Sequence, residues 1–558
     1  METVLHTKSA RAYLSRNTTE KTIEGDLFTA FVAAGAISKA NADDPKKSQL
    51  VRCARTDKGV HAAGNVISLK LIVEDKDIVE KINEHLSPQI RVWGYERTVN
   101  SFSCYQACDS RWYEYLLPTH ALLPPHPSSF LGRMLPEHAE KAGDMKEYLA
   151  RQAEVADFWT ETEENYVKEV LESMNESTRA LVMKALYEPD SDIDETPIDQ
   201  VKTDNADAIK PETADTAVKS EHDDEQVKPE SEMETKEEQT IEQVKQEVDQ
   251  TPQEQVLTTV GDVAQAATAE VTSEEAAPVA GEANETSSAA NGGAQAEAVS
   301  PEQRNAAERK KDLDAAIKQV RIAYMNAKRA YRVSDARKQR VADALKLFLG
   351  TCNFHNYTVE KGFRDPSAQR HIKSFTLNPT PIVINGTEWL SIKVHGQSFM
   401  MHQIRKMISM IALTIRCGCP LSRITESFKD TTISIPKVPG LGLLLERPVF
   451  ESYNEGAASK FDREKIDFAK YEKEMEEFKR REIYDRIFRE EAESNAFHTF
   501  FAHVDSFREG QFLYLTSMGL EAVKGLSTQR GGANKGRKGV KNTGVDSDDE
   551  GGAGGEDG

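Results

Sequence analysis

A short polar turn, Arg55-Thr56-Asp57-Lys58-Gly59, holds the residues best suited to chemistry. It places the Asp57 carboxylate between two cations, and Gly59 lets the backbone bend sharply. A carboxylate that a neighbouring cation keeps ionised can act as a nucleophile, forming and later releasing a covalent adduct. The plainer alternative is a solvated turn in which Arg55 and Asp57 pair weakly, and an arbitrary Arg-x-Asp sequence favours that alternative.

The longer sequence around this turn favours the catalytic interpretation over the solvated turn. Residues 55–62, Arg-Thr-Asp-Lys-Gly-Val-His-Ala, resemble the active-site motif of the tRNA pseudouridine synthase A family, and most closely that of its eukaryotic nuclear branch. The resemblance implies that Asp57 is the nucleophile that isomerises uridine to pseudouridine in RNA. It also implies substrate contacts for Arg55, Lys58 and His61, with Arg55 filling the space that the base leaves or gripping the neighbouring phosphate.

A second segment, Arg111-Trp112-Tyr113-Glu114-Tyr115, resembles the Arg-x-Tyr-x-Tyr element of the same family. On a strand the side chains of Tyr113 and Tyr115 share a face, so one ring can stack on a base while the other packs behind it. The resemblance assigns the stacking role to Tyr113, with a further role as proton acceptor. Without the motif, two core tyrosines would be the simpler interpretation.

A third segment, residues 399–405, resembles the family's Phe-x-x-His-x-(Val/Ile)-Arg motif. In the family its arginine pairs with the catalytic aspartate, which assigns Arg405 to Asp57 and gives Phe399 and His402 substrate contacts. A surface pair of Arg405 with the lysine that follows it is the alternative, and it would be favoured if the Asp57 motif were absent.

Hydropathy periodicity predicts the elements that position these residues. Strands are expected at 60–69, 90–98 and 381–394, and helices at 21–37, 76–86 and 302–348. A further helix from about Ser398 should turn Met401, Ile404, Met407 and Ile408 inward and hold Arg405 at one margin. Residues 438–450 resemble the family's closing strand, which implies that Gly440 and Gly442 let its backbone approach the substrate closely. The first 20 residues show no strand pattern, although the family begins with a β-strand there.

We therefore expect an α/β (α+β) pseudouridine synthase fold, with an antiparallel central sheet built from two sequence halves and flanked by helices. The expected order is the poorly matched N-terminus at 1–20, the first half of the catalytic domain at 21–118, a helical excursion at 119–190, a disordered acidic insertion at 191–300, the second half at 301–450, a helical extension at 451–527 that lies against the catalytic domain, and a disordered tail at 528–558.

The net charge of -21 over 558 residues is unusual for a protein that must contact phosphates. The excess is confined to residues 191–300, which hold 28 acidic residues, 6 lysines and no arginine, a net -22 that leaves +1 for the remainder. Without Phe, Trp or Tyr, this segment cannot bury enough apolar surface to offset its ordering entropy. Residues 301–340, with 12 basic and 5 acidic residues, are the best candidate for a phosphate-binding surface, and a solvated helix face is the alternative.

The six cysteines stand at scattered spacings, which indicates a reducing, intracellular setting with mostly free thiols. Cys417-x-Cys419, downstream of His402, suggests a structural zinc, but the fuller ligand set of a zinc site is missing, so buried free thiols are the favoured interpretation. The sequence shows neither a secretory signal nor an apolar run long enough to span a bilayer, and we expect no membrane association.

The resemblance implies an isomerase that converts specific uridines of tRNA to pseudouridine, around the anticodon stem-loop, and further uridines in small nuclear RNA or mRNA. The target uridine has to leave its stack for Asp57 to reach it, and this redox-neutral reaction requires no cofactor. We expect a monomer in the nucleus, since the basic cluster from Lys535 to Lys541 suits an import signal, although a solubilising tail would also explain it.

Two other classes of function compete with this one. The first is a catalytically impaired tRNA-binding or RNA-chaperone protein of the same fold, suggested by the missing first strand. The second is an interaction scaffold that acts through the acidic insertion.

Overall fold

The computed structural model describes residues 2–8, 22–57, 59–187 and 301–524 of the chain. The chain divides into two compact units, and every described residue belongs to the unit made of residues 1–192 and 299–558. The expectations for the insertion at 191–300 and for the tail at 528–558 therefore lie outside the described residues.

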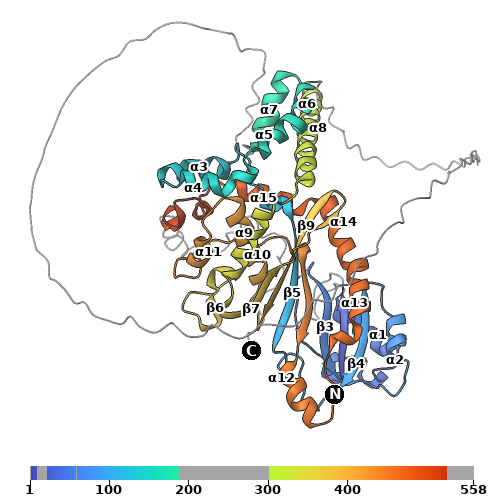
Figure 1. The fold of residues 1–558 in the computed structure, drawn as a ribbon. Helices are drawn as coiled ribbons and strands as arrows, with labels where there is room; N and C mark the ends of the chain where they lie inside the picture. Colours follow the sequence, from blue (N-terminus) through green and yellow to red (C-terminus); the bar gives the residue numbers. More distant parts are fainter. Residues whose placement is uncertain (1, 9–21, 58, 188–300, 525–558) are drawn as a thin grey trace, which may run out of the picture. The chain divides into compact units, whose positions relative to one another are not determined.

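A single sheet of ten strands organises the described residues (Figure 1). The strands are β1 (Glu2–Lys8), β2 (Val51–Arg52), β3 (His61–Leu69), β4 (Ile90–Arg97), β5 (Ser110–Pro118), β6 (Gly350–Asn353), β7 (Gln369–Leu377), β8 (Ile382–Ile384), β9 (Thr387–Gly396) and β10 (Leu443–Val449). Their order is β4-β1-β3-β10-β5-β9-β7-β6, with β2 paired to β3 and β8 paired to β9.

The two halves of the sequence interleave in this sheet, as expected, because β10 lies between β3 and β5. The pairing differs from the predicted antiparallel sheet at one place. β10 runs antiparallel to β5 but parallel to β3, with Leu444 opposite His61. Since β3 and β5 run in opposite directions, a strand inserted between them can be antiparallel to only one of the two.

The N-terminal residues form a strand that the sequence pattern did not predict. β1 pairs antiparallel with both β3 and β4, so that Val4 stands opposite Ile67 on one side and Tyr95 on the other. Its short run ETVLHTK has weak alternation, and ladders on both sides impose the extended conformation on it. The expectation that the first strand is missing was therefore wrong. Because that expectation was the reason for considering the chain catalytically impaired, the reason no longer holds.

Helices flank the sheet. Those of the first half are α1 (Ile23–Ala33), α2 (Ile78–Glu84), α3 (Phe130–Lys141), α4 (Met145–Gln152), α5 (Phe158–Thr162), α6 (Lys168–Glu172) and α7 (Glu176–Tyr187). Those of the second half are α8 (Pro301–Ala330), α9 (Asp335–Lys346), α10 (Gln403–Arg416), α11 (Ser422–Glu426), α12 (Glu451–Tyr453), α13 (Glu472–Phe478), α14 (Asp485–Ser494) and α15 (Ala496–Ser506). Short 3₁₀ and π turns join several of them.

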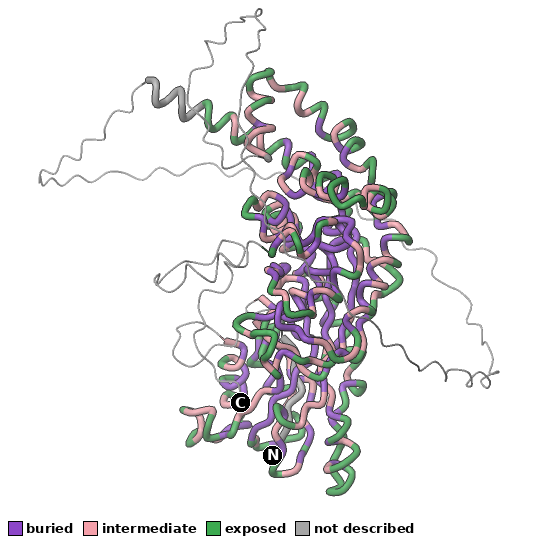
Figure 2. Tube along the Cα trace, turned by 90° about the vertical axis from the view of Figure 1, so that its left-hand side faces the viewer, coloured by how far each residue is buried: buried purple, intermediate pink, exposed green. Residues whose placement is uncertain are grey.

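Buried apolar side chains of the described residues form three clusters around these elements (Figure 2). The largest joins the sheet centre to α9, α10 and the C-terminal helices, and so lies directly beneath the recognised motifs. A second joins α1 and α2 to β3 and β4. The third holds α7 against α8, where Val182 and Val320 are both 0% exposed.

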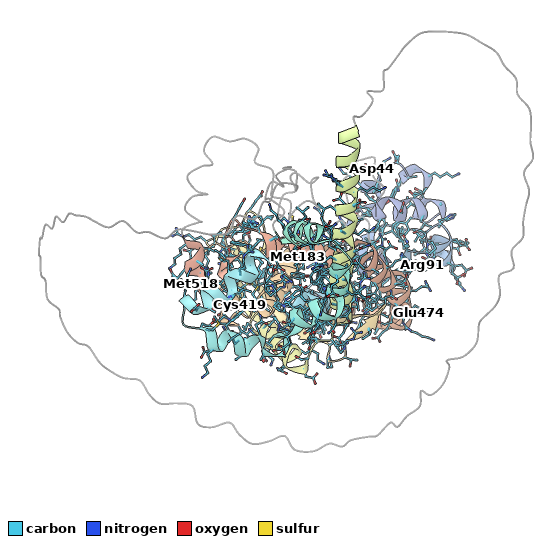
Figure 3. All side chains as sticks on the ribbon, turned by 90° about the horizontal axis from the view of Figure 1, so that it is seen from above. Asp44, Arg91, Met183, Cys419, Glu474 and Met518 are labelled. Atoms are coloured by element: carbon cyan, nitrogen blue, oxygen red, sulfur yellow. The ribbon has the colours of Figure 1, made fainter. Side chains whose placement is uncertain are left out.

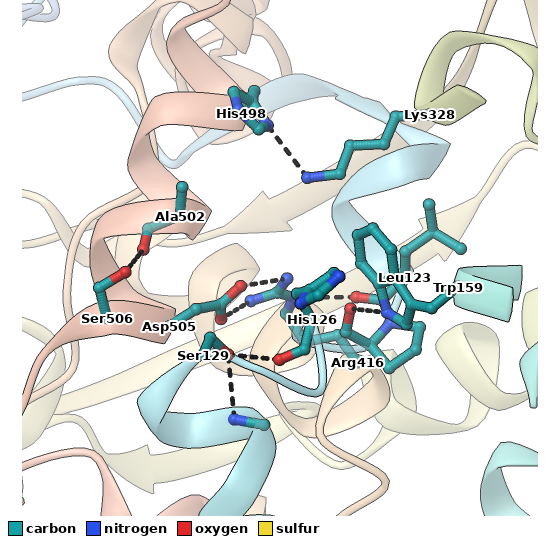
Figure 4. Close-up of polar contacts among 12 residues, drawn as sticks. Leu123, His126, Ser129, Trp159, Lys328, Arg416, His498, Ala502, Asp505 and Ser506 are labelled. Carbon is teal, nitrogen blue, oxygen red and sulfur yellow. Dashed lines mark hydrogen bonds and ion pairs between the residues drawn. The ribbon is translucent and has the colours of Figure 1, made fainter. Parts of the chain in front are cut away.

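The single basic helix predicted at 302–348 is two helices, because α8 ends at Ala330 and the Ser334 side chain caps a new helix, α9. Part of the predicted positive surface is also used internally. Lys328 donates to Nδ1 of His498 at 3.0 Å (Figure 4), and Arg337 is fully buried beside Gln152. Within residues 309–330 of α8, the part whose side-chain exposure the structure describes, the exposed cations are Arg309, Lys310, Lys311, Lys318 and Arg321. A phosphate-binding surface on this segment is therefore narrower than the sequence count indicates.

The C-terminal extension packs against the catalytic domain, as expected, and its segment from Lys479 to Tyr484 lies on the face of the sheet opposite Tyr113. Its Tyr484 hydroxyl donates to Oε2 of Glu114 on β5 at 2.6 Å, and its Lys479 ammonium lies 2.8 Å from Oε1 of Glu446 on β10. The two carboxyl groups stand on neighbouring strands, and Lys479, also 3.6 Å from Oε2 of Glu114, offsets their mutual repulsion together with Lys393, which lies 3.4 Å from Oε1 of Glu446. The extension is thus part of the support for the two central strands.

Candidate active site

The loop between β2 and β3 carries Asp57 on a tight turn. Gly59 adopts φ +81°, a left-handed conformation that suits glycine, and the Val60 amide donates to the Asp57 carbonyl at 3.2 Å. Below the turn, the buried amide of Asn65 donates to the Ala54 carbonyl at 3.1 Å. The loop is therefore anchored to β3 just before the carboxylate.

Two side chains from the second half of the chain reach the same carboxylate oxygen. Nδ1 of His402 donates to Oδ2 of Asp57 at 3.3 Å, and a terminal nitrogen of Arg405 lies 4.0 Å from that oxygen. The side chains of His402 and Arg405 are 8% and 4% exposed, whereas that of Asp57 is 31% exposed. The arrangement leaves the carboxylate accessible while both of its partners are shielded from solvent.

The helix that presents these partners differs from its prediction in where it begins. α10 starts at Gln403 rather than near Ser398, because His402 takes a left-handed conformation, φ +62°, as its N-cap. Met401, predicted to point inward, therefore lies before the helix and is 58% exposed. Ile404, Met407 and Ile408 are buried as expected, and Arg405 is buried rather than marginal.

The surroundings of Asp57 favour its ionised form. Burial, the largest influence, raises the pKa of this carboxyl, but the hydrogen bond from His402 and the charges of His402, Arg405 and Lys437 outweigh it, so the pKa lies below its usual value. An anionic carboxylate at neutral pH is what a nucleophilic role requires. Lys437 is a contributor that the sequence motifs did not identify, although it stands next to the recognised Val438 to Phe450 segment.

Arg405 is held in place by the segment that leads into β10. Its Nε donates to the Val438 carbonyl at 2.7 Å, and the Tyr115 hydroxyl donates to the neighbouring Pro439 carbonyl, also at 2.7 Å. A side chain at Gly442 would come within 2.4 Å of the Leu116 carbonyl. This glycine therefore permits close packing of backbone on β5, rather than the predicted approach of backbone to substrate.

Tyr113 and Phe399 form the aromatic part of the site. Their rings meet edge to face with centroids 5.3 Å apart, and Tyr113 is 8% exposed. Burial raises the pKa of Tyr113, so its hydroxyl stays protonated at neutral pH. This favours ring contact and hydrogen-bond donation over proton acceptance as a phenolate.

The remaining predicted substrate contacts are distributed unevenly. Arg55 is exposed on the Asp57 loop, where it can meet RNA, and Lys58 lies outside the described residues. His61 is 0% exposed at the start of β3, so its side chain belongs to the core beneath the loop. The structure thus brings together Asp57, His402 and Arg405 directly, and it does not place His61 at an accessible surface.

The suggested zinc site is not supported. Across the described ranges, no group of three or more His, Cys, Asp or Glu side chains could hold a metal ion. Cys419 (Figure 3) is 2% exposed, its thiol donates to the Leu515 carbonyl, and burial raises its pKa to about 12. In the same described part of the chain, no helix is long and apolar enough to cross a membrane.

Comparison with known proteins finds one matching family and several similar relatives. Residues 344–451 match the family described as tRNA pseudouridine synthase. The chain is 42% identical to tRNA pseudouridine synthase 1 of Schizosaccharomyces pombe over 513 residues, which cover 90% of this chain and 82% of that protein. It is 37% identical to the protein of the same name from Yarrowia lipolytica, covering 90% and 74%. A Saccharomyces cerevisiae protein named tRNA pseudouridine(27/28) synthase is 28% identical, covering 78% and 80%.

Proposed function

This chain belongs to the tRNA pseudouridine synthase family, whose members are isomerases that need no cofactor, and we propose that Asp57 is the nucleophile of its reaction. The observation that carries the proposal is the convergence of His402 and Arg405 on one oxygen of an otherwise accessible carboxylate. These contacts join the two halves of the sequence, because Asp57 lies in the first half and His402 and Arg405 lie in the second. A surface pair of Arg55 and Asp57 would not require such a meeting.

The proposed reaction starts with the target uridine turned out of its stack into the space between the Asp57 loop and Phe399. The Tyr113 ring, in contact with Phe399, limits where the uracil can lie. An oxygen of Asp57 then bonds either to C6 of uracil or to C1′ of ribose. Both routes break the N1–C1′ bond, form the C5–C1′ bond, transfer the C5 proton and release the carboxylate.

Arg405 and His402 have the same electrostatic task in either route. They keep Asp57 ionised before attack and hold Oδ2, so that Oδ1 can face the substrate. The uracil that is freed within the site has to rotate before it rejoins the ribose. A cleft in which the carboxylate is fixed, and in which the aromatic rings cover the base, keeps the two fragments close together.

We extend the proposal to the RNA targets and the setting. One relative is named for pseudouridine(27/28) in tRNA, which supports uridines of the anticodon stem-loop region as targets here. Small nuclear RNA and mRNA are proposed as further substrates, acted on by a monomer in the nucleus. The basic cluster at 535–541 supports the nuclear setting, and it lies outside the described residues.

The nucleophile is tested by replacing Asp57 with asparagine, which keeps the shape of the side chain. We expect Asp57→Asn to abolish pseudouridine formation in unmodified tRNA while tRNA affinity stays within a few-fold, since phosphate contacts supply most of the affinity. Carbodiimide mapping measures the product. Asp75→Asn, at an exposed carboxylate paired with Lys81, is the control and should keep full activity. Turnover by Asp57→Asn near the parental rate would show that the assignment is wrong.

A further inference from the structure

Arg111 connects two loops of the active site. It lies on β5 two residues before Tyr113, so both side chains point to the same face of the sheet. One terminal nitrogen donates to the Cys53 carbonyl at 3.1 Å, 58 residues upstream, and the other donates to the Gln397 carbonyl at 3.4 Å, 286 residues downstream. A single guanidinium therefore joins main-chain groups of the two sequence halves.

The two carbonyls that Arg111 contacts belong to the two segments that carry the active-site residues. Cys53 begins the loop that carries Asp57, and Gln397 begins the turn that carries Phe399 and His402. Neither the loop at 53–57 nor the turn at 397–400 has regular secondary structure. Arg111 stands between them because β5 lies between β10 and β9, with Arg111 opposite Gly396 of β9.

We propose that Arg111 is a positioning residue that sets the separation of the Asp57 loop from the Phe399 and His402 turn. This inference rests on the proposed function, because that separation is also the space for the flipped uracil. A planar fork with two terminal nitrogens can donate to two carbonyls at once, whereas a lysine ammonium cannot reproduce that geometry. A displacement of about 1 Å between reacting groups can cost about 10²-fold in rate.

The alternative role for Arg111 is a phosphate contact, since its side chain is only half-buried. The two roles differ in what they change. A phosphate contact contributes to tRNA affinity, so its loss raises Kd and reduces the salt dependence of binding. A positioning residue acts on the chemical step, so its loss lowers the single-turnover rate constant at saturating enzyme while Kd changes little.

The experiment compares Arg111→Met, Arg111→Lys and Arg111→Ala with Arg447→Met in the full chain. Arg447 is the control because it is exposed on β10 opposite Trp112, whose side chain points to the other face of the sheet. We expect the Arg111→Met and Arg111→Lys single-turnover rate constants to fall about 10²-fold, with tRNA Kd within threefold of the parent. Guanidinium ion should restore part of the rate of Arg111→Ala, and Arg447→Met should react like the parent.

Hydrogen exchange of the free proteins gives a readout that does not depend on catalysis. Arg111→Met should increase exchange in residues 53–60 and 397–402 without lowering Tm by more than a few degrees, and Arg447→Met should not. Unchanged exchange in both segments overturns the inference even if the parent is active. A rise in Kd with an unchanged rate constant also overturns it and assigns Arg111 to phosphate. A parent without pseudouridine activity refutes the proposed function instead, while exchange still decides the role of Arg111.

Discussion

At the scale of single residues, the site depends on how charge is distributed around one carboxylate. His402 and Arg405 both meet Oδ2 of Asp57, and Lys437 adds a positive charge nearby. Burial alone would raise the pKa of Asp57 and make it a poor nucleophile at neutral pH. The cations therefore do more than orient the carboxylate, since they also determine the pH range in which it is ionised.

His402→Gln should shift the acidic limb of the pH–rate profile to higher pH. The pKa of Asp57 is lowered mainly by the hydrogen bond and the charge of His402, so glutamine, which is neutral, lets it rise. The rate falls as pH drops through this pKa, and the fall should begin at a higher pH in the variant. Single-turnover rates between about pH 4 and pH 8 measure the shift.

Exposed His85 provides the control, since His85→Gln should leave the profile unchanged. If His402→Gln lowers the rate equally at every pH, then His402 does not hold Asp57 in its ionised form. Its contribution would instead be confined to contact with the substrate.

At the scale of secondary-structure elements, the sequence predicts the contiguous motifs well, but it predicts neither β1 nor the first residue of α10. The sequence string around Asp57 identifies the loop because the motif is local, and β4 alternates between buried and partly exposed residues as periodicity predicts. The sequence does not predict β1, because pairing with β3 and β4 imposes its extended conformation and its own hydropathy pattern does not indicate a strand. The start of α10 was misplaced since the left-handed conformation of His402 has no signature in the sequence.

The same reasoning explains which side chains of the site were not found. Lys437 lowers the pKa of Asp57 from a segment distant in sequence, and no spacing distinguishes it from an ordinary surface cation. Arg111 belongs to the recognised Arg-x-Tyr-x-Tyr element, but that element does not indicate its bond to the Cys53 carbonyl. His61 was assigned to the substrate because it belongs to the motif. Its burial beneath the loop shows that motif membership alone does not separate contact with substrate from support of the loop.

The junction of α14 and α15 should make stability depend on pH through Glu491. This carboxylate accepts from the Phe497 amide at 3.2 Å, and burial raises its pKa from the ordinary 4.5 to about 7. Between these values the folded chain binds more protons than the unfolded chain, so the free energy of unfolding falls as pH rises. Glu491→Gln should remove this dependence and stabilise the protein at pH 8 by at most roughly 3 kcal/mol.

Urea unfolding at pH 5 and pH 8 measures the effect, provided that the transition is two-state. Glu493 is exposed on the same helix, so Glu493→Gln is the control and should leave the pH dependence of stability intact. A parent whose stability does not change between the two pH values would show that Glu491 is not titrating in this range.

At the scale of the whole chain, the excess negative charge lies in a different segment from the catalytic residues. Residues 191–300 carry a net -22 and the remainder carries +1, so the acidic character of the protein is not a property of its catalytic part. α7 and α8, which flank the insertion, pack against each other through buried residues such as Val182 and Val320. The described residues on either side of the insertion thus join the two halves through contacts of their own.

Deleting residues 191–300 and joining the ends through a Gly/Ser linker of about 20 residues should preserve fold and pseudouridine formation, because loop-closure entropy changes only slowly with length. Removing the negative charge should leave tRNA affinity unchanged or slightly tighter, most visibly at low salt. A second variant, with an uncharged Gly/Ser segment of the original length, separates charge from length. Equal affinity in both variants, above that of the parent, would attribute the gain to charge. A folded deletion variant that binds tRNA much more weakly would instead show that the acidic insertion takes part in recognition.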